Sequence, residues 1–306
     1  MALAVTAVLA AMAGAAPPAF ATADQVAKVE PGTFTVTIEH AGQDRTALVH
    51  VPTGYDGTSR LPTLLHFPGL YETPEIAELF GHHFAHADRH GYLMVIPAHY
   101  STGWQGVPGG PGSPDVDDPG FIRALLDELK ADYNADPARI YASGMSNGGF
   151  FTHLTACRLA GSFAAFAAVS GQLSTGLVSS CSPGRPLPIL MIHGDGDPVV
   201  PIDVSYAPLA DATRYWTTNN RCGAATTSVD LPNTTADNTT VTRHTWTGCP
   251  ANAPVVFYEI NRGGHTWPGG TPFLPPPLLG WHCTDINAND VIWNFVAPHR
   301  LPDTAS

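Results

Sequence analysis

The spacing of hydrophobic positions along this chain predicts an alternation of strands and helices. Residues 33–39 and 45–51 alternate apolar and polar side chains, as half-buried strands do. Continuous short apolar runs are typical of strands buried on both faces, and they occupy residues 61–67, 92–97, 140–142, 163–169, 187–193 and 254–260. The last of these runs is expected to be the last strand.

Helices are expected between the strands, over residues 74–90, 121–133, 150–159, 203–217 and 288–296. Residues 98–119 are rich in Gly and Pro and lack a core pattern, which predicts a surface loop. Asp117 and Asp118 at its end are expected to cap the next helix rather than to act in catalysis. Buried strands alternating with helices predict an α/β fold, with a mostly parallel sheet and helices on both faces.

The composition restricts the classes of partner. The chain has 306 residues and a net charge of −12, and Lys28 and Lys130 are its lysines. Such a chain is a poor match for nucleic acids and anionic membranes. No internal repeat or linker is visible, so we expect a single domain over residues 24–306.

The N-terminus resembles an export signal. Residues 2–16 are apolar and rich in Ala, and Ala19-Phe20-Ala21 fits an A-x-A cleavage pattern. We therefore expect a signal peptide over residues 1–23 and a secreted protein. The run is too short for a membrane span. Five cysteines fit an oxidising compartment: Cys157, Cys181, Cys222, Cys249 and Cys283. Because their number is odd, at least one thiol is left unpaired within the chain.

A G-x-S-x-G pattern, residues 144–148, follows the strand that ends at residue 142 and precedes a helix. Small residues leave room for a sharp strand-to-helix turn, which would expose the hydroxyl of Ser146. The backbone N–H of Asn147, at the start of the helix, would face a developing negative oxygen. This context predicts a nucleophile of acyl transfer at Ser146.

Two further turns follow strand ends, where open α/β sheets place their ligand sites. One contains Asp197 and the other His265, in the chain order serine, acid, histidine. His265 would accept the Ser146 proton, and Asp197 would hold the imidazole tautomer. Asp195 is the alternative acid, although a residue between two glycines often bonds its own turn. His193 is expected to shape its turn.

Other histidines cluster in one predicted helix. His82, His86 and His90 are spaced at i, i+4 and i+8, with His83 beside them. This spacing could bind a metal, but no carboxylate or cysteine of the stretch joins the set. We interpret the cluster as a solvated helix face and expect no metal and no cofactor.

The motifs resemble one known family. Residues 116–171 look like the polyhydroxybutyrate-depolymerase-type esterases, beside which secreted feruloyl and acetylxylan esterases stand. The family patterns HG-x-x-D and GGH-x-W-P-G match His193, Gly194, Asp197, Gly263, Gly264, His265, Trp267, Pro268 and Gly269. The resemblance implies an α/β-hydrolase fold with Ser146, Asp197 and His265 as nucleophile, acid and base. It also points to a disulfide between Cys222 and Cys249, which bracket a polar stretch. Cys157 with Cys181 is a second pairing, which leaves Cys283 free.

One departure concerns the oxyanion hole. Family members usually have a small residue or cysteine after an H-G pair, whereas this chain reads His66-Phe67-Pro68-Gly69-Leu70. Pro68 has no N–H to donate. Asn147 is one expected donor, and Phe67, Gly69 and Leu70 remain open as the second.

These observations predict a secreted serine carboxylic-ester hydrolase that works through an acyl-enzyme. Aromatic residues would line the acyl pocket: Tyr71, Trp104, Trp267 and Trp281. Expected substrates are small or oligomeric feruloyl or short-acyl esters, including plant cell-wall esters. A polyhydroxyalkanoate-type polyester is a further possibility, slightly disfavoured because no surface-binding domain is visible. A peptidase or amidase, or a non-catalytic binding protein on a hydrolase fold, are the alternatives.

Overall fold

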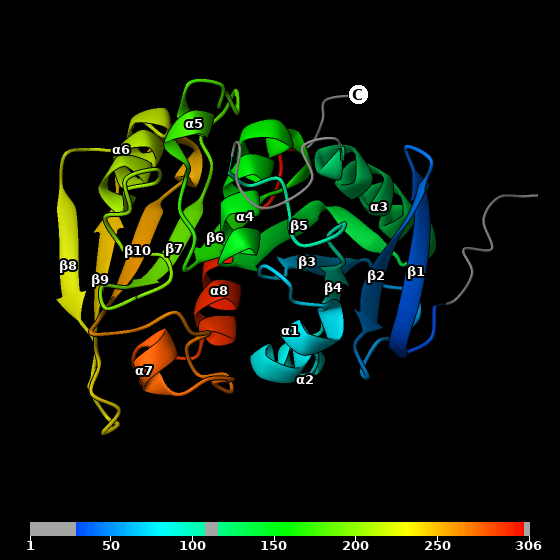
Figure 1. Ribbon diagram of the computed structural model, residues 1–306. Coiled ribbons are helices and arrows are strands. Elements are labelled where there is room, and N and C mark those ends of the chain that lie inside the picture. The colour runs from blue at the N-terminus through cyan, green and yellow to red at the C-terminus, as the bar shows by residue number, and fades with distance from the viewer. Residues whose placement is uncertain (1–28, 108–115, 303–306) are drawn as a thin grey trace, which may run out of the picture.

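The computed structural model describes residues 29–107 and 116–302. Within these residues, one ten-stranded sheet crosses the molecule and carries helices on both faces (Figure 1). The α/β arrangement predicted from the hydrophobic pattern is therefore confirmed. The predicted signal peptide lies outside the described residues.

The sheet has a parallel centre and antiparallel edges. Strands β4, β3, β5, β6, β7 and β10 run parallel, whereas β2 and β1 on one side and β9 and β8 on the other are antiparallel to their neighbours. In spatial order the strands are β1 (Gly32–His40), β2 (Gln43–Val51), β4 (Leu93–Pro97), β3 (Leu61–Phe67), β5 (Ala135–Met145), β6 (Ala165–Val169), β7 (Ile189–Gly194), β10 (Val255–Asn261), β9 (Thr240–Trp246) and β8 (Thr226–Asp230).

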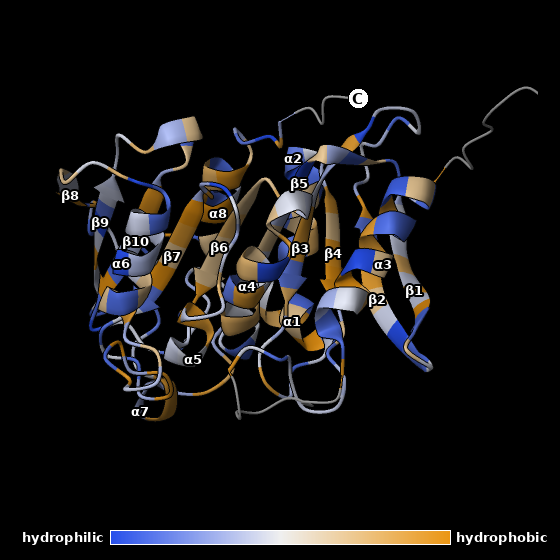
Figure 2. Cartoon of the chain, turned by 90° about the horizontal axis from the view of Figure 1, so that it is seen from above, coloured by the Kyte–Doolittle hydropathy of each residue, from blue (hydrophilic) through white to orange (hydrophobic). Residues whose placement is uncertain are grey.

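The helices form two layers. Side chains of α3, α4 and α6 join the hydrophobic cluster on one face of the sheet, and those of α1, α2 and α8 join the cluster on the other face. Figure 2 shows the hydrophobic central strands between these layers. The helices are α1 (Pro74–Gly81), α2 (His83–His90), α3 (Asp118–Asp132), α4 (Asn147–Arg158), α5 (Thr175–Val178), α6 (Leu209–Asn219), α7 (Pro276–Leu279) and α8 (Ala288–Val296), with short 3₁₀ turns at Ala160–Ser162 and Pro250–Asn252.

The expectation of a single helix over residues 74–90 is wrong, because the helix is interrupted between α1 and α2. His82 adopts a left-handed conformation with φ of 54°, and its backbone N–H closes α1 on the carbonyl of Glu78. Gly81 permits the break, because a side chain there would collide with the ring of His83, 2.2 Å from the position of its Cβ.

The region between residues 203 and 252 also differs from expectation. Helix α6 begins at Leu209, after Pro208, so the preceding residues are not helical. The polar stretch 219–252 contains β8 and β9, which extend the sheet beyond β10. β10 remains the last strand in the described chain.

Of the two acids expected to cap α3, Asp117 does so by accepting a hydrogen bond from the Gly120 N–H. The expectation is wrong for Asp118, which makes a buried ion pair with Arg45 at 2.7 Å. Disulfides join Cys222 to Cys249 and Cys157 to Cys181, and Cys283 is a buried free thiol.

None of the helices described is both long and apolar enough to cross a bilayer.

Candidate active site

Ser146 stands at the turn between β5 and α4, with φ of 54° and ψ of −121°. This backbone conformation is rare for a residue with a side chain, and strained residues of this kind cluster at functional sites. Its N–H donates to the Val169 carbonyl at 2.9 Å, and its carbonyl accepts from the Phe150 N–H at 3.0 Å. The backbone of Ser146 is thus fixed from both sides while its side chain remains accessible.

Two glycines allow this turn to pack closely. A Cβ on Gly144 would lie 2.3 Å from the Gly148 carbonyl oxygen, and a Cβ on Gly148 would lie 1.9 Å from the Phe67 carbonyl oxygen. No larger residue fits at either position without moving backbone. The motif that the sequence provides is therefore required by the approach of α4 to β3 and β5.

His265 and Asp197 meet beside this turn. Asp197 follows β7 and His265 follows β10, and these strands are parallel neighbours, so both residues reach the same edge of the sheet. The Nδ1 atom of His265 lies 2.7 Å from Oδ2 of Asp197, and both side chains are buried. The other oxygen, Oδ1, accepts the N–H groups of Val199 and Val200 at 2.8 Å each. The carboxylate is thereby aimed at one ring nitrogen.

Asp195 points elsewhere. Its carboxylate accepts the backbone N–H of Arg262 and so joins the turn after β7 to the turn after β10. His193 Nε2 donates to the Val200 carbonyl at 2.8 Å, and this nitrogen is 3.5 Å from Asp197 Oδ2. Burial lowers the pKa of His193, so this ring stays neutral and supports the turn.

Ser146 and His265 line one open cavity of about 430 Å³. Most of its wall is apolar, and the lining residues come from the loop after β3, from α1 and from the chain around α7: Gly69, Leu70, Tyr71, Glu72, Ile76, Phe80, Met145, Ser146, Val199, His265, Phe273 and Leu279. In the described chain, no hydrogen bond joins the Ser146 hydroxyl to His265. Such contacts are often long in unliganded hydrolases and tighten around a substrate.

The loop after β3 faces Ser146. Of the open candidates for a second oxyanion donor, Phe67 is the last residue of β3, is fully buried and does not line the cavity. Gly69 and Leu70 both line it. A Cβ built on Gly69 would lie 3.6 Å from Ser146 Cβ, which places this loop against the serine.

The four aromatic residues expected in the acyl pocket have different places. Tyr71 lines the cavity and is 71% exposed, at its rim. Trp104 is fully buried, where it packs on Phe67 and Phe151, so it cannot contact a substrate. Its Nε1 instead donates to the Pro68 carbonyl at 3.1 Å and supports the loop. Trp281 is half exposed and lies outside the residues lining the cavity.

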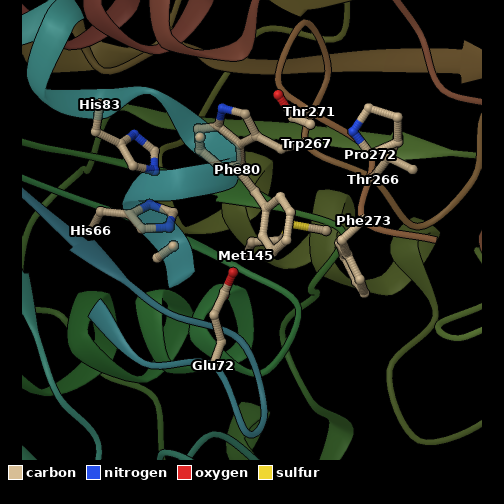
Figure 3. Close-up of a pocket in the computed structure, with 12 residues that line it drawn as sticks. His66, Glu72, Phe80, His83, Met145, Thr266, Trp267, Thr271, Pro272 and Phe273 are labelled. Carbon is tan, nitrogen blue, oxygen red and sulfur yellow. The ribbon is translucent and has the colours of Figure 1, made fainter. Parts of the chain in front are cut away.

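Trp267 lines a second, small cavity beside the first. This space of about 20 Å³ has room for roughly one water molecule. Figure 3 shows Glu72 entering it from one side and Trp267, His66 and His83 from the other. Burial lowers the pKa of His66 far below its usual range and that of His83 to about 3, so both rings are neutral. Trp267 Nε1 is buried without a partner here.

Sequence reasoning missed Glu72, which lines both cavities. Its Oε2 accepts the Gly69 N–H at 2.6 Å. Burial raises the pKa of the Glu72 carboxyl, while the Gly69 hydrogen bond and His265 act in the opposite direction. No motif marks this residue, because its partner is a backbone group.

The histidines near residue 86 are not a solvated helix face, and that interpretation is wrong. His83 and His86 are buried, and the break at His82 separates it from the helix that carries the others. His83 Nδ1 meets Asn289 Oδ1 at 2.9 Å, and His86 Nε2 meets Asp290 Oδ1 at 3.0 Å. Both partners belong to α8, so these rings fasten α2 to α8.

This chain is similar in sequence to proteins named as esterases. No family model matches the chain. It is 27% identical over 232 residues to a bifunctional acetylxylan esterase/xylanase, XynS20E, of Neocallimastix patriciarum, covering 74% of this chain and 31% of that protein. It is 28% identical over 239 residues to feruloyl esterase B of Piromyces equi, covering 72% and 42%. It is 30% identical over 174 residues to feruloyl esterase C of Emericella nidulans, covering 56% of each.

The chain thus spans about a third to just over half of the length of these curated relatives. The predicted resemblance to feruloyl and acetylxylan esterases is confirmed. Among solved structures, an acetyl xylan esterase from Aspergillus awamori superposes with a TM-score of 0.57 at 16% identity, covering 77% of this chain and 94% of that one. The fold is that of an α/β-hydrolase.

Proposed function

We propose that this protein is a serine carboxylic-ester hydrolase with Ser146 as nucleophile, His265 as base and Asp197 as acid. The observation that carries the proposal is the 2.7 Å contact of His265 Nδ1 with Asp197, beside a strained serine in the same cavity. The esterase names of the relatives support the reaction class.

The reaction follows from the positions of these groups. Asp197 holds the tautomer with hydrogen on Nδ1, which leaves Nε2 of His265 to accept the Ser146 hydroxyl proton. The serine oxygen then bonds to the ester carbonyl carbon, and negative charge collects on the carbonyl oxygen. This intermediate collapses to an acyl-serine as His265 returns the proton to the leaving alcohol. Water, activated by the same nitrogen, releases the acid and restores the serine.

The N–H of Asn147, at the N-terminus of α4, is one donor for the oxyanion. A second comes from the loop after β3. Two donors matter because losing one costs on the order of 10²–10³-fold in turnover.

For the substrate, we propose an ester with an aromatic or short acyl group on a soluble or oligomeric alcohol, such as a feruloyl or acetyl ester of plant cell-wall sugars. The apolar wall of the cavity fits an apolar acyl group. A hydroxyalkanoate polyester is the second candidate, because the sequence motifs resemble enzymes of that class. Two disulfides fit an exported protein.

A fluorophosphonate probe tests the reaction class. Wild-type protein should be labelled at Ser146, whereas Ser146→Ala should not. A panel of feruloyl, acetyl, hydroxybutyrate and peptide substrates then tests the bond cleaved. Faster hydrolysis of the peptide than of every ester would favour an amidase, and an unlabelled serine would favour a binding protein.

A further inference from the structure

The carboxylate of Glu72 closes the loop that faces Ser146. Its Oε2 accepts the Gly69 N–H at 2.6 Å, and the Glu72 N–H in turn donates to the Gly69 carbonyl at 3.2 Å. These reciprocal bonds span three residues, so the backbone between them has little freedom. The turn lies directly against Ser146, since a Cβ on Gly69 would be 3.6 Å from Ser146 Cβ.

The Gly69 N–H is therefore occupied and cannot bind an oxyanion while Glu72 holds it. The next N–H along the loop belongs to Leu70, which lines the cavity. Within the described residues this N–H donates no hydrogen bond. The N–H of Tyr71 is used, because it donates to the Thr102 carbonyl at 2.9 Å. Leu70 thus carries the free donor of this loop.

Leu70 and Asn147 also lie together. A Cβ built on Gly103 would be 2.7 Å from both the Asn147 side-chain oxygen and Leu70 Cδ1, so both residues surround the same glycine. The amide of Asn147 fastens this segment by bonding the Trp104 N–H at 2.6 Å and the Trp104 carbonyl at 3.2 Å. The loop after β3 is thus held at its start by Trp104, whose Nε1 donates to the Pro68 carbonyl, and at its end by Glu72.

We propose that Glu72 is a positioning residue for the oxyanion hole: by engaging Gly69 N–H, it fixes the turn that presents Leu70 N–H as the second donor beside Asn147 N–H. The proposal rests on the esterase function proposed above. It places the missing donor one residue beyond the glycine that follows Pro68, which has no N–H.

Three variants of Glu72 distinguish the effects of its hydrogen-bond acceptor, its charge and its side-chain volume. Glu72→Gln keeps an oxygen that can accept the Gly69 N–H but loses the charge. Glu72→Met keeps approximate volume without an acceptor, and Glu72→Ala removes both. An oxyanion donor acts on the transition state more than on the bound substrate, so its misplacement lowers kcat with little change in KM.

We expect Glu72→Met and Glu72→Ala to lower kcat by roughly 10- to 100-fold, with KM changed less than about 3-fold. Inhibition by a trifluoromethyl ketone, which forms a tetrahedral oxyanion on serine, should weaken in parallel. Glu72→Gln should keep kcat within about 3-fold of wild type. Glu75→Ala is the matched control, since Glu75 is exposed in the first turn of α1 and lies outside the cavity lining.

Unchanged kcat in Glu72→Met, or a Glu72→Gln variant as damaged as Glu72→Ala, overturns the positioning role. Glu72→Met decides the matter if the alanine variant fails to fold. A wild-type protein without esterase activity and without serine labelling would instead refute the proposed function. An active wild type with unaffected Glu72 variants refutes this inference alone.

A second feature, a cluster of possible metal ligands, lies between α2 and α8. His86, His90 and Asp290 place one possible ligand atom each within 4.8 Å of one another. The carboxylate absent from the histidine-rich stretch of sequence is thus supplied by α8. His86 Nδ1 meets the Tyr92 hydroxyl at 2.9 Å, which orients the ring and leaves Nε2 facing Asp290 Oδ1 at 3.0 Å.

We propose that His86, His90 and Asp290 bind a divalent transition metal such as Zn²⁺, which joins α2 to α8. Two ligand atoms at about 2.1 Å from a tetrahedral metal lie roughly 3.4 Å apart, close to the observed spacing of His86 and Asp290. The exposed His90 ring, now stacked on His86 with centroids 4.2 Å apart, must turn its nitrogen inward.

Thermal unfolding with EDTA or with ZnCl₂ tests this site. At about 100-fold excess over its dissociation constant, Zn²⁺ should raise Tm by ~3–5 °C. His90→Ala and Asp290→Asn, both exposed, should abolish the rise, and His82→Ala, outside the cluster, should keep it. No rise in wild type, or a rise that survives both ligand variants, overturns the site.

Discussion

His265 Nδ1 and Asp197 Oδ2 lie 2.7 Å apart although 68 residues separate them in the chain. Adjacent parallel strands bring them together, since β7 ends just before Asp197 and β10 ends just before His265. The second carboxylate oxygen is held by two backbone N–H groups. The pair is therefore rigid, and the direction of the imidazole follows from the fold.

Replacing the two aspartates of this turn should have opposite consequences. Asp197→Asn should lower kcat by about 10⁴-fold, because an amide can hold the wrong imidazole tautomer. Asp195→Asn should keep most activity, since Asp195 bonds the Arg262 backbone and does not touch His265. Steady-state kinetics on one aryl ester compares them. An inactive Asp195→Asn with an active Asp197→Asn would contradict the assignment.

Removing the hydroxyl of the proposed nucleophile should leave the fold intact. Ser146→Ala should lower turnover by at least ~10³-fold, because no alternative hydroxyl occupies the strained turn. Tm should change little, since the backbone contacts of Ser146 do not involve its side chain. Activity above a tenth of wild type, in a preparation free of wild-type protein, would rule out this nucleophile.

Much of this arrangement could be predicted because it depends on local sequence. The G-x-S-x-G turn needs glycines for close packing, and the spacing from His193 to Asp197 places the acid. Glu72 could not be found in this way, because its partner is the N–H of Gly69, and a backbone group leaves no signature in sequence.

Two other errors have physical causes. The break at His82 arises from packing of Gly81 against His83, which the periodicity of the helix does not reveal. Strands β8 and β9 lack a hydrophobic pattern because their residues are mostly polar or exposed. Their many β-branched threonines, as in residues 226–230 and 240–246, were the signal that could have identified them.

The protein should lose stability on acidification at pH values well above those at which carboxylates ordinarily titrate. His66, His83 and His153 are buried, and burial depresses their pKa values, to about 3 for His83 and His153. Their stabilising contribution is full above the unfolded pKa of about 6.5 and is lost as pH falls through it, because only the unfolded chain then takes up protons.

Three such groups give a loss of up to ~4 kcal/mol of unfolding free energy per pH unit below that value. Urea unfolding at pH 7, 6 and 5 measures this slope. His153→Asn keeps an acceptor for Trp216 Nε1, which bonds His153 Nδ1 at 3.1 Å, and should reduce the slope by ~1.4 kcal/mol per unit. A stability that is flat from pH 7 to 5 would contradict the prediction.

Glu78 should have the opposite pH dependence, because burial raises its pKa whereas burial lowers the pKa of the histidines. It is partly buried between α1 and α2, and its Oε2 accepts the Phe84 N–H in the first turn of α2 at 3.0 Å. Burial raises its pKa to about 7, against weaker opposing effects of the Phe84 and His83 backbone hydrogen bonds. Its contribution to stability is present below the unfolded pKa of about 4.3 and is lost as pH rises through 7.

Glu78→Gln keeps the oxygen that accepts the Phe84 N–H and removes the ionisation. Because Glu78 is partly exposed, solvent screening limits the gain to ~1–2 kcal/mol. We expect the variant to unfold ~2–4 °C above wild type at pH 8 and at the same temperature at pH 4.5. Glu75→Gln, exposed on the same helix, should shift Tm at neither pH. An equal shift of Glu78→Gln at both pH values would mean that the amide acts through packing, and that the charge of Glu78 does not weaken the junction of α1 and α2.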